Sequence, residues 1–208
     1  MLSQGDISGD ISLVEHGKTY IKQKFKKPGA VFLGLVHRLD RPVSGIVVLA
    51  RTSKALTRMN ALFKNKETRK VYWAIVKNKP LSNEGTLKHW LLKDEKKNRT
   101  TAFKKETAGA QYAELDYRVM ATAAGHWLLE VKPLTGRPHQ IRVQLASMNC
   151  PIKGDIKYGG EEPNEDGSIC LHAKQLSFQH PVQKTPLIVE APPPDMGLWK
   201  YFLKLDLG

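Results

Sequence analysis

The chain has 208 residues, of which 41% are hydrophobic and 25% charged, a composition that suits one globular domain with a substantial core. It contains no apolar run near the roughly 18 residues of a membrane span, no secretory signal pattern, and only two cysteines, so we expect a cytoplasmic protein with no membrane partner. The formal net charge of +13 predicts a polyanionic partner, and the excess is concentrated in residues 51–70 and 88–105.

The first half of the chain predicts two amphipathic helices with a short strand between them. Ser12 can cap a helix to about residue 25, and its apolar residues are expected to face inward: Leu13, Val14, Ile21 and Phe25. The unbroken apolar run from Gly45 to Ala50 predicts a strand that is buried on both faces. Ser53 can cap the second helix, whose apolar positions recur at helical spacing: Leu56, Met59, Leu62 and Phe63.

The second half of the chain predicts mainly strands. Residues 70–77 are strand-like, and residues 112–120 and 126–131 suit a hairpin with an Ala-Gly turn at 124–125. Pro138 suits the first turn of a further helix, which would carry Ile141, Leu145 and Met148. Strand signals return at 169–178. Helices inserted among such strands predict an α+β fold with a mixed, mostly antiparallel sheet and flanking helices.

Three segments combine polar residues with turn signals: HRLDRPVSG at 37–45, RKVYWAIV at 69–76 and TGRPHQIRVQLA at 135–146. A metal site is not expected in them, because the chain has neither an HExxH motif nor paired CxxC motifs that would support His37 with Asp40, or His139 with His172, as zinc ligands. Ser44 lies in PVSG and not in the GxSxG turn of a serine nucleophile.

Asp40 is a single carboxylate between Arg38 and Arg41. One interpretation is a salt bridge that ties down a loop. The alternative comes from Arg142, which helical spacing places beside His139 and away from the apolar stripe. An arginine in this position could hold the carboxylate ionised, which is the state that covalent catalysis by aspartate requires.

The segment HRLDRPVSG resembles the signature HRLDxxTSG of the RluA-type pseudouridine synthases. KVYWAIV is similar to their KxYxAxV strand, and LTGRPHQIR to their LxTGRxHQIR segment. PIKGDIKYG at 151–159 and LHAKQLSFQHP at 171–181 resemble later blocks of the family in the same order. The resemblance covers residues 10 to 185, and five ordered blocks are far more specific than HRLD alone.

The resemblance implies an enzyme that isomerises uridine to pseudouridine within structured RNA, rRNA or tRNA, in a central RNA-binding cleft and without cofactor or metal. Asp40 would be the nucleophile, with attack at C1′ of the ribose or at C6 of the ring both open. Tyr72 would stack on the flipped uracil and could help to remove the C5 proton, unless it is only a core aromatic. Arg142 would pair with Asp40. The implied RNA-binding residues are Arg38, Arg41, His37, Arg137 and His139, the last of which could instead satisfy a helix terminus.

The chain departs from the family pattern at three places. Val43 stands where the family has Thr, and Gln144 where it has His. The family also begins with strands that lead into a Lys-Pro-x-Gly motif, and MLSQGD is similar to the segment directly after that motif. We therefore expect residues 1–208 to form a single catalytic domain, a monomer, that lacks the first strands of the family and has no separate RNA-binding module.

Two other functions stay open from the sequence. One is a non-catalytic RNA-binding protein. The other is a metal-dependent RNA phosphodiesterase that would use His37, Asp40 and His139.

Overall fold

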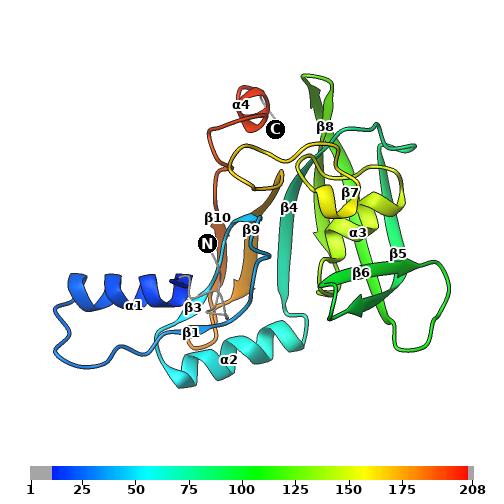
Figure 1. Cartoon of the computed structure of the whole chain (residues 1–208). Coiled ribbons are helices and arrows are strands. Elements are labelled where there is room, and N and C mark those ends of the chain that lie inside the picture. Colours follow the sequence, from blue (N-terminus) through cyan, green and yellow to red (C-terminus); the bar gives the residue numbers. More distant parts are fainter. Residues whose placement is uncertain (1–10, 206–208) are drawn as a thin grey trace.

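The structure is a computed structural model that describes residues 11–205 (Figure 1). It confirms the α+β fold, with helices flanking a mixed and mostly antiparallel sheet. The helices are α1 (Leu13–Lys24), α2 (Ser53–Lys64), α3 (Gln140–Ser147), the 3-10 helix η1 (Ile156–Tyr158) and α4 (Trp199–Phe202). The strands are β1 (Gly34–Leu35), β2 (Ser44–Gly45), β3 (Leu49–Ala50), β4 (Thr68–Val76), β5 (Glu84–Asp94), β6 (Arg99–Phe103), β7 (Gln111–Ala123), β8 (His126–Pro133), β9 (Leu171–Gln179) and β10 (Pro186–Glu190).

The main sheet follows the order β10-β9-β4-β8-β7-β5-β6 with antiparallel neighbours, and β2 adds a short parallel pair to β9. Strands β1 and β3 form a separate two-stranded sheet. In Figure 1, α3 lies against the part of the sheet formed by β5 to β8, whereas α1 and α2 lie at the other end, beside β1 and β3. Strand β4 connects the two parts of the sheet, because it pairs with β8 on one side and with β9 on the other.

The main core forms around the paired strands β4 and β8 in the middle of the sheet. Residues 74–76 and Leu128 with Leu129 are fully buried, and Ile141 and Leu145 of α3 belong to the same cluster. Because α3 contributes these side chains to the core, its position relative to β4 is held by packing. This packing places Arg142 of α3 beside Asp155, next to η1, and beside the loop that carries Asp40.

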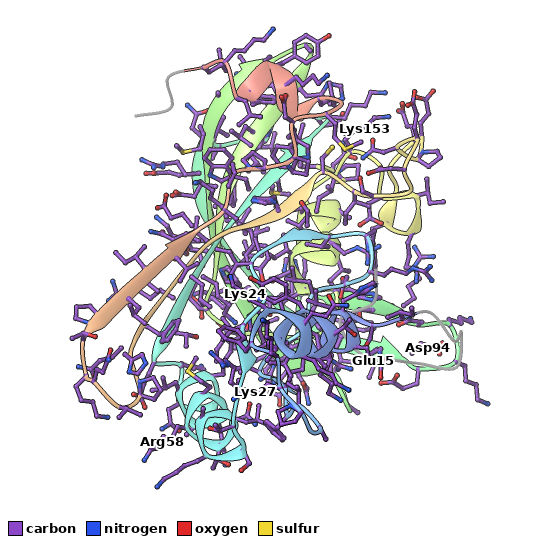
Figure 2. All side chains as sticks on the ribbon, turned by 90° about the vertical axis from the view of Figure 1, so that its left-hand side faces the viewer. Glu15, Lys24, Lys27, Arg58, Asp94 and Lys153 are labelled. Carbon is purple, nitrogen blue, oxygen red and sulfur yellow. The ribbon has the colours of Figure 1, made fainter. Side chains whose placement is uncertain are left out.

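Both helices at the other end carry exposed basic residues. Figure 2 views this end and labels Lys24, Lys27 and Arg58, all exposed, on α1 and α2 and on the loop after α1. Helix α2 contains no acidic residue. Among residues 11–205, no helix is long and apolar enough to cross a membrane.

The prediction of one doubly buried strand from Gly45 to Ala50 is wrong. The chain forms β2 at 44–45, leaves the sheet, and pairs again only at 49–50, and Ile46 to Leu49 are partly exposed. The break occurs at Gly45, whose φ of +117° is a conformation that only glycine adopts readily. A Cβ there would also lie 2.4 Å from the carbonyl oxygen of Ala173, so Gly45 allows the close approach of β2 to β9.

Several predicted helix ends are also displaced. Ser12 caps α1 as expected, but Phe25 is exposed at 46% of its surface and lies under the guanidinium of Arg51. Thr52, not Ser53, caps α2, because its side chain accepts the hydrogen bond from the amide of Ala55. Helix α3 begins at Gln140, after Pro138 and after a left-handed residue at 139, and it ends before Met148.

The hairpin prediction is confirmed, since β7 and β8 pair through the turn at 124–125, where both residues have positive φ. The strands predicted at 70–77 and 169–178 appear as β4 and β9, each displaced by about two residues at one end. The β5–β6 hairpin is not among the predicted elements, although it contains most of the basic segment 88–105. The expectation about MLSQGD lies outside the described residues.

Candidate active site

The loop of residues 36–43, between β1 and β2, carries Asp40 into a cleft. The amide of Val43 donates to the carbonyl of Asp40 at 2.9 Å, and the amide of Ile169 donates to the carbonyl of Pro42 at 2.9 Å. After the loop, Ser44 pairs with His172 in the parallel β2–β9 ladder. Backbone contacts on both sides therefore fix the loop relative to β9.

Side chains strengthen the attachment of β2 to β9. Nε2 of His172 lies 3.1 Å from the carbonyl of Ala191 and must donate to it, so Nδ1 accepts the hydrogen bond from the hydroxyl of Ser44 at 2.8 Å. Burial lowers the pKa of His172, which keeps the ring neutral and suits this arrangement. Ser44 is thus engaged in positioning the loop, in agreement with the absence of a serine-nucleophile motif around it.

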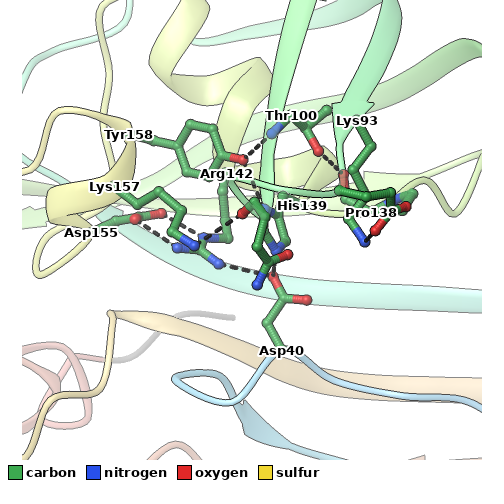
Figure 3. Close-up of polar contacts among 11 residues, drawn as sticks. Asp40, Lys93, Thr100, Pro138, His139, Arg142, Asp155, Lys157 and Tyr158 are labelled. Carbon is green, nitrogen blue, oxygen red and sulfur yellow. Dashed lines mark hydrogen bonds and ion pairs between the residues drawn. The ribbon is translucent and has the colours of Figure 1, made fainter. Parts of the chain in front are cut away.

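Arg142 joins two carboxylates at the floor of the cleft (Figure 3). Its Nε and Nη2 donate to the two oxygens of Asp155 at 2.7 and 2.8 Å, a bidentate pair, and its Nη1 donates to Oδ2 of Asp40 at 3.1 Å. Asp155 is 1% exposed, whereas the side chain of Asp40 is 31% exposed. Arg142 is therefore anchored by the buried acid and presents Nη1 to the acid that faces solvent.

The charge of Arg142 is maintained despite its burial. Burial alone would lower the pKa of the guanidinium, but the hydrogen bonds and negative charges of Asp155 and Asp40 outweigh this effect and raise the pKa. The predicted pairing of Arg142 with Asp40 is present, so a permanent cation lies beside the carboxylate. Sequence patterns do not single out Asp155, although it lies in the segment PIKGDIKYG that carries part of the family resemblance.

Tyr72 reaches the same cleft from β4, at a bulge between Val71 and Tyr72. Burial, and secondarily the charge of Asp40, raises the pKa of the phenol to about 12. The hydroxyl is therefore protonated at neutral pH, and Tyr72 lies close enough to Asp40 for the carboxylate charge to affect its pKa.

All eight residues predicted for the site line one cleft of about 1190 Å³. They are Asp40, Tyr72, Arg142, Arg38, Arg41, His37, Arg137 and His139. Arg38 and Arg41 are exposed at the mouth, and Nε of Arg137 donates to the carbonyl of Tyr112 at 3.0 Å. Lysines 64, 66, 70, 93 and 157 also line the cleft, so its walls are strongly positive.

His37 makes a hydrogen bond and a ring contact within the protein that the sequence does not indicate. Its Nε2 accepts a hydrogen bond from the amide of Val48 at 3.1 Å, and its ring stacks on Phe63. Burial, together with the charge of Lys70, lowers the pKa of His37 to about 4. The ring is therefore neutral at physiological pH and cannot contribute positive charge to RNA binding.

His139 lies within the site and at the entrance to α3. Its backbone is left-handed, with φ of 54°, and its side chain makes no helix-cap hydrogen bond. Its Nδ1 lies 2.7 Å from the hydroxyl of Tyr158, and its Nε2 lies 3.9 Å from Oδ2 of Asp40. Tyr158, like Asp155, belongs to the segment PIKGDIKYG, and no local pattern in the sequence marks it as a site residue.

Potential metal ligands do not gather in the described part of the chain. Within residues 11–205, no three His, Cys, Asp or Glu side chains are placed to share a metal ion. Cys150 and Cys170 are free and buried. The groups that converge in the cleft are a solvent-facing carboxylate, a permanent cation and an aromatic ring, which together suit nucleophilic attack on a planar base or its sugar.

Comparison with known proteins agrees with this chemistry. Residues 3–147 match the family model described as RNA pseudouridylate synthase. The chain is 35% identical over 161 residues to an uncharacterized RNA pseudouridine synthase of Zymomonas mobilis, covering 77% of this chain and 73% of the relative. It is 32% identical over 197 residues to tRNA pseudouridine synthase C of Vibrio cholerae, covering 86% and 80%.

Solved structures support the fold. The structure of human RNA Pseudouridylate Synthase Domain Containing 4 superposes with a TM-score of 0.76 at 24% identity, covering 93% of this chain and 82% of that chain. A non-catalytic RNA-binding protein and a metal-dependent phosphodiesterase are not favoured by the family model or by these relatives. The chain belongs to the RNA pseudouridylate synthase family, the isomerases that convert uridine in RNA to pseudouridine.

Proposed function

We propose that the chain isomerises a uridine in structured tRNA or rRNA with Asp40 as the nucleophile. The observation that carries this proposal is the arrangement of Asp40, whose carboxylate faces the cleft while Arg142 holds one of its oxygens. An exposed salt bridge would serve to tie down the loop, but the loop is already attached through its backbone and Ser44. The carboxylate is thus available for chemistry.

The reaction balances without a cofactor along either route. In attack at C1′, a carboxylate oxygen bonds to C1′ while the N1–C1′ electron pair leaves with the uracil. The base then rotates, C5 bonds to C1′, the carboxylate is released, and the C5 proton is lost as N1 gains one. In attack at C6, the carboxylate adds to the ring before the same exchange of bonds. Both routes need an ionised Asp40, and Arg142 favours that state.

Tyr72 is proposed to stack on the uracil and to pass on the C5 proton. With a pKa of about 12, its hydroxyl cannot act as a free phenolate at neutral pH. It can accept the C5 proton only as it gives its own proton to a second base. Asp40 is released as a carboxylate when C5 bonds to C1′, so it can accept that proton and then lose it to water, which returns Asp40 to its ionised state. The ring itself provides the stacking surface.

We expect Tyr72→Phe and Tyr72→Leu to separate these two roles. The Phe variant keeps the ring, so KM for the RNA should change little while kcat falls. The Leu variant also loses roughly 1–3 kcal/mol of base stacking, so KM should rise as well. Steady-state kinetics of tritium release from C5-labelled RNA measures both constants.

The exposed Tyr201, on α4, offers a matched control, since Tyr201→Phe should leave both constants unchanged. Full kcat in Tyr72→Phe would show that the tyrosine only stacks. Unchanged constants in both Tyr72 variants would remove this residue from the active site.

RNA binding is proposed to use the positive walls of the cleft. Arg38, Arg41 and Arg137 would contact phosphates or fill the gap left by the everted base, and His37 would contact RNA as a neutral ring. Eversion of a base costs a few kcal/mol, and phosphate contacts from these residues and from α2 can offset that cost in a salt-dependent way. We propose that the protein acts as a monomer in the cytoplasm.

Pseudouridine mapping of total RNA tests the function. Cells that lack the gene should lose pseudouridine at one or a few positions of tRNA or rRNA, and the wild-type gene should restore it. If no position is lost while the purified protein still binds RNA, the protein is an RNA-binding protein without this activity. RNA cleavage that a chelator abolishes would instead identify a phosphodiesterase.

A further inference from the structure

A chain of polar contacts connects β6, η1 and α3 to Asp40 (Figure 3). The amide of Thr100 in β6 donates to the hydroxyl oxygen of Tyr158 at 2.7 Å, and this hydroxyl lies 2.7 Å from Nδ1 of His139. The hydroxyl of Thr100 donates to the carbonyl of Pro138 at 3.1 Å, which holds the residue before His139. Tyr158 and Thr100 are buried, so these contacts are shielded from water.

The partners of Tyr158 determine which nitrogen of His139 carries the proton. Because the Thr100 amide can only donate, the Tyr158 oxygen is the acceptor in that contact, and its own O–H is left to donate. His139 is the partner in reach, so its Nδ1 accepts and its Nε2 carries the hydrogen. This assignment directs the Nε2–H toward Oδ2 of Asp40, which lies 3.9 Å away.

The charges around His139 are compatible with a neutral ring. Asp40 faces it from the loop before β2, Arg142 from α3, Lys157 from η1 and Lys93 from β5. Burial lowers the pKa of His139, and the three cations act in the same direction against the opposing effect of Asp40. At physiological pH the ring is therefore neutral, and its Nε2–H lies on the side of the carboxylate.

The two oxygens of Asp40 are consequently not equivalent. Oδ2 accepts the hydrogen bond from Nη1 of Arg142 and faces Nε2 of His139, whereas no residue within 11–205 donates a hydrogen bond to Oδ1. In Figure 3, one carboxylate oxygen is turned toward Arg142 and His139 and the other is turned away from them. An oxygen that is not engaged by these donors keeps its lone pairs available and is the better nucleophile.

We propose that His139, held by Tyr158, is a positioning residue that orients Asp40 so that Oδ1 is the attacking atom. When Oδ1 forms its bond to carbon, Oδ2 becomes the carbonyl oxygen of the ester and keeps its contacts with Arg142 and His139. When the ester breaks, the electron pair returns to the carboxylate. This inference rests on the proposed role of Asp40 as the nucleophile, and it assigns to His139 a function other than RNA contact.

Two substitutions at His139 each keep one of its two contacts and remove the other. Glutamine places an N–H near the position of Nε2, so His139→Gln can still face Asp40 but loses the bond to Tyr158. Asparagine reaches only the position of Nδ1, so His139→Asn can keep the bond to Tyr158 and tolerates the left-handed backbone, but it cannot reach Asp40. We expect His139→Gln to retain kcat within about threefold of the wild type, and His139→Asn to lose about ten- to a hundredfold, as for a misplaced reacting group.

The alternatives give different patterns. If His139 serves only the start of α3, His139→Asn should be the more active and more stable variant, which would overturn the proposal. If His139 binds RNA, KM should rise in both variants with kcat unchanged, which would also overturn it. Thermal unfolding of both proteins shows whether a loss of kcat reflects a loss of folded enzyme. His126→Gln at the start of β8 is the matched control and should match the wild type.

Tyr158→Phe tests whether Tyr158 acts through His139. The ring remains under the guanidinium of Arg142, at 5.1 Å, and only the O–H is lost. We expect kcat to fall about tenfold in the wild-type background, because the imidazole of His139 can then carry its hydrogen on Nδ1 in place of Nε2. In the His139→Gln background kcat should be unchanged, because the glutamine amide keeps its N–H without Tyr158. Equal losses in the two backgrounds would overturn the connection. A wild-type protein without activity would refute the proposed function itself, which is a separate outcome.

Discussion

Replacement of Asp40 by Asn is expected to abolish pseudouridine formation while the protein stays folded and binds RNA. The amide is nearly the same size and can still accept a hydrogen bond from Arg142, but it is neutral and is a very poor nucleophile. Asp40 is partly exposed, and its loop is held by backbone contacts, so stability should change by less than about 1 kcal/mol. Tritium release from C5-labelled RNA should fall below about 1% of wild type.

The matched control is Asp195→Asn, which removes an exposed carboxylate from another part of the chain. It should have wild-type activity, so the loss in Asp40→Asn cannot be attributed to the change in net charge. RNA affinity of Asp40→Asn, measured by filter binding, should equal that of the wild type. Activity above a few per cent in Asp40→Asn would refute the assignment of the nucleophile.

Substitution of Arg142 should have the second-largest effect, and it should affect stability as well as activity. Arg142→Ala leaves Asp155 buried without its cation, which costs about 3–5 kcal/mol, and it removes the donor that holds Asp40. Activity should fall by about 10²- to 10³-fold, the usual cost of losing one electrostatic donor from a preorganised site.

Arg142→Lys should recover only part of both losses. Lysine restores the charge, but its ammonium cannot donate two parallel bonds to Asp155 and a third to Asp40 from one planar group. Urea unfolding and tritium release measure the two properties. The exposed pair Arg118–Glu130 provides a control, because Arg118→Lys should change neither property appreciably. Full recovery in Arg142→Lys would mean that Arg142 acts only as a point charge.

Local patterns in the sequence determined the elements whose forces act over a few residues. The cap at Ser12, the apolar spacing of α2 and the Ala-Gly turn between β7 and β8 each depend on neighbours within one turn of chain. The motifs around Asp40, Tyr72 and Arg142 also identified residues that the structure brings to one cleft. Where a local pattern was ambiguous, as in the apolar run after Gly45, the sequence predicted one continuous strand over residues 45–50 and the chain formed two shorter ones.

The tertiary structure decided the contacts that join distant segments. Ser44 and His172 are 128 positions apart, and their pairing depends on the return of β9 beside β2. Arg142 has Asp155 as its main partner because η1 packs against α3, an arrangement that charge spacing along the chain does not encode. The neutral state of His37 likewise results from burial against Phe63. Burial and charge act through space, so only the folded chain fixes which carboxylate is sequestered as an anchor and which one faces the cleft.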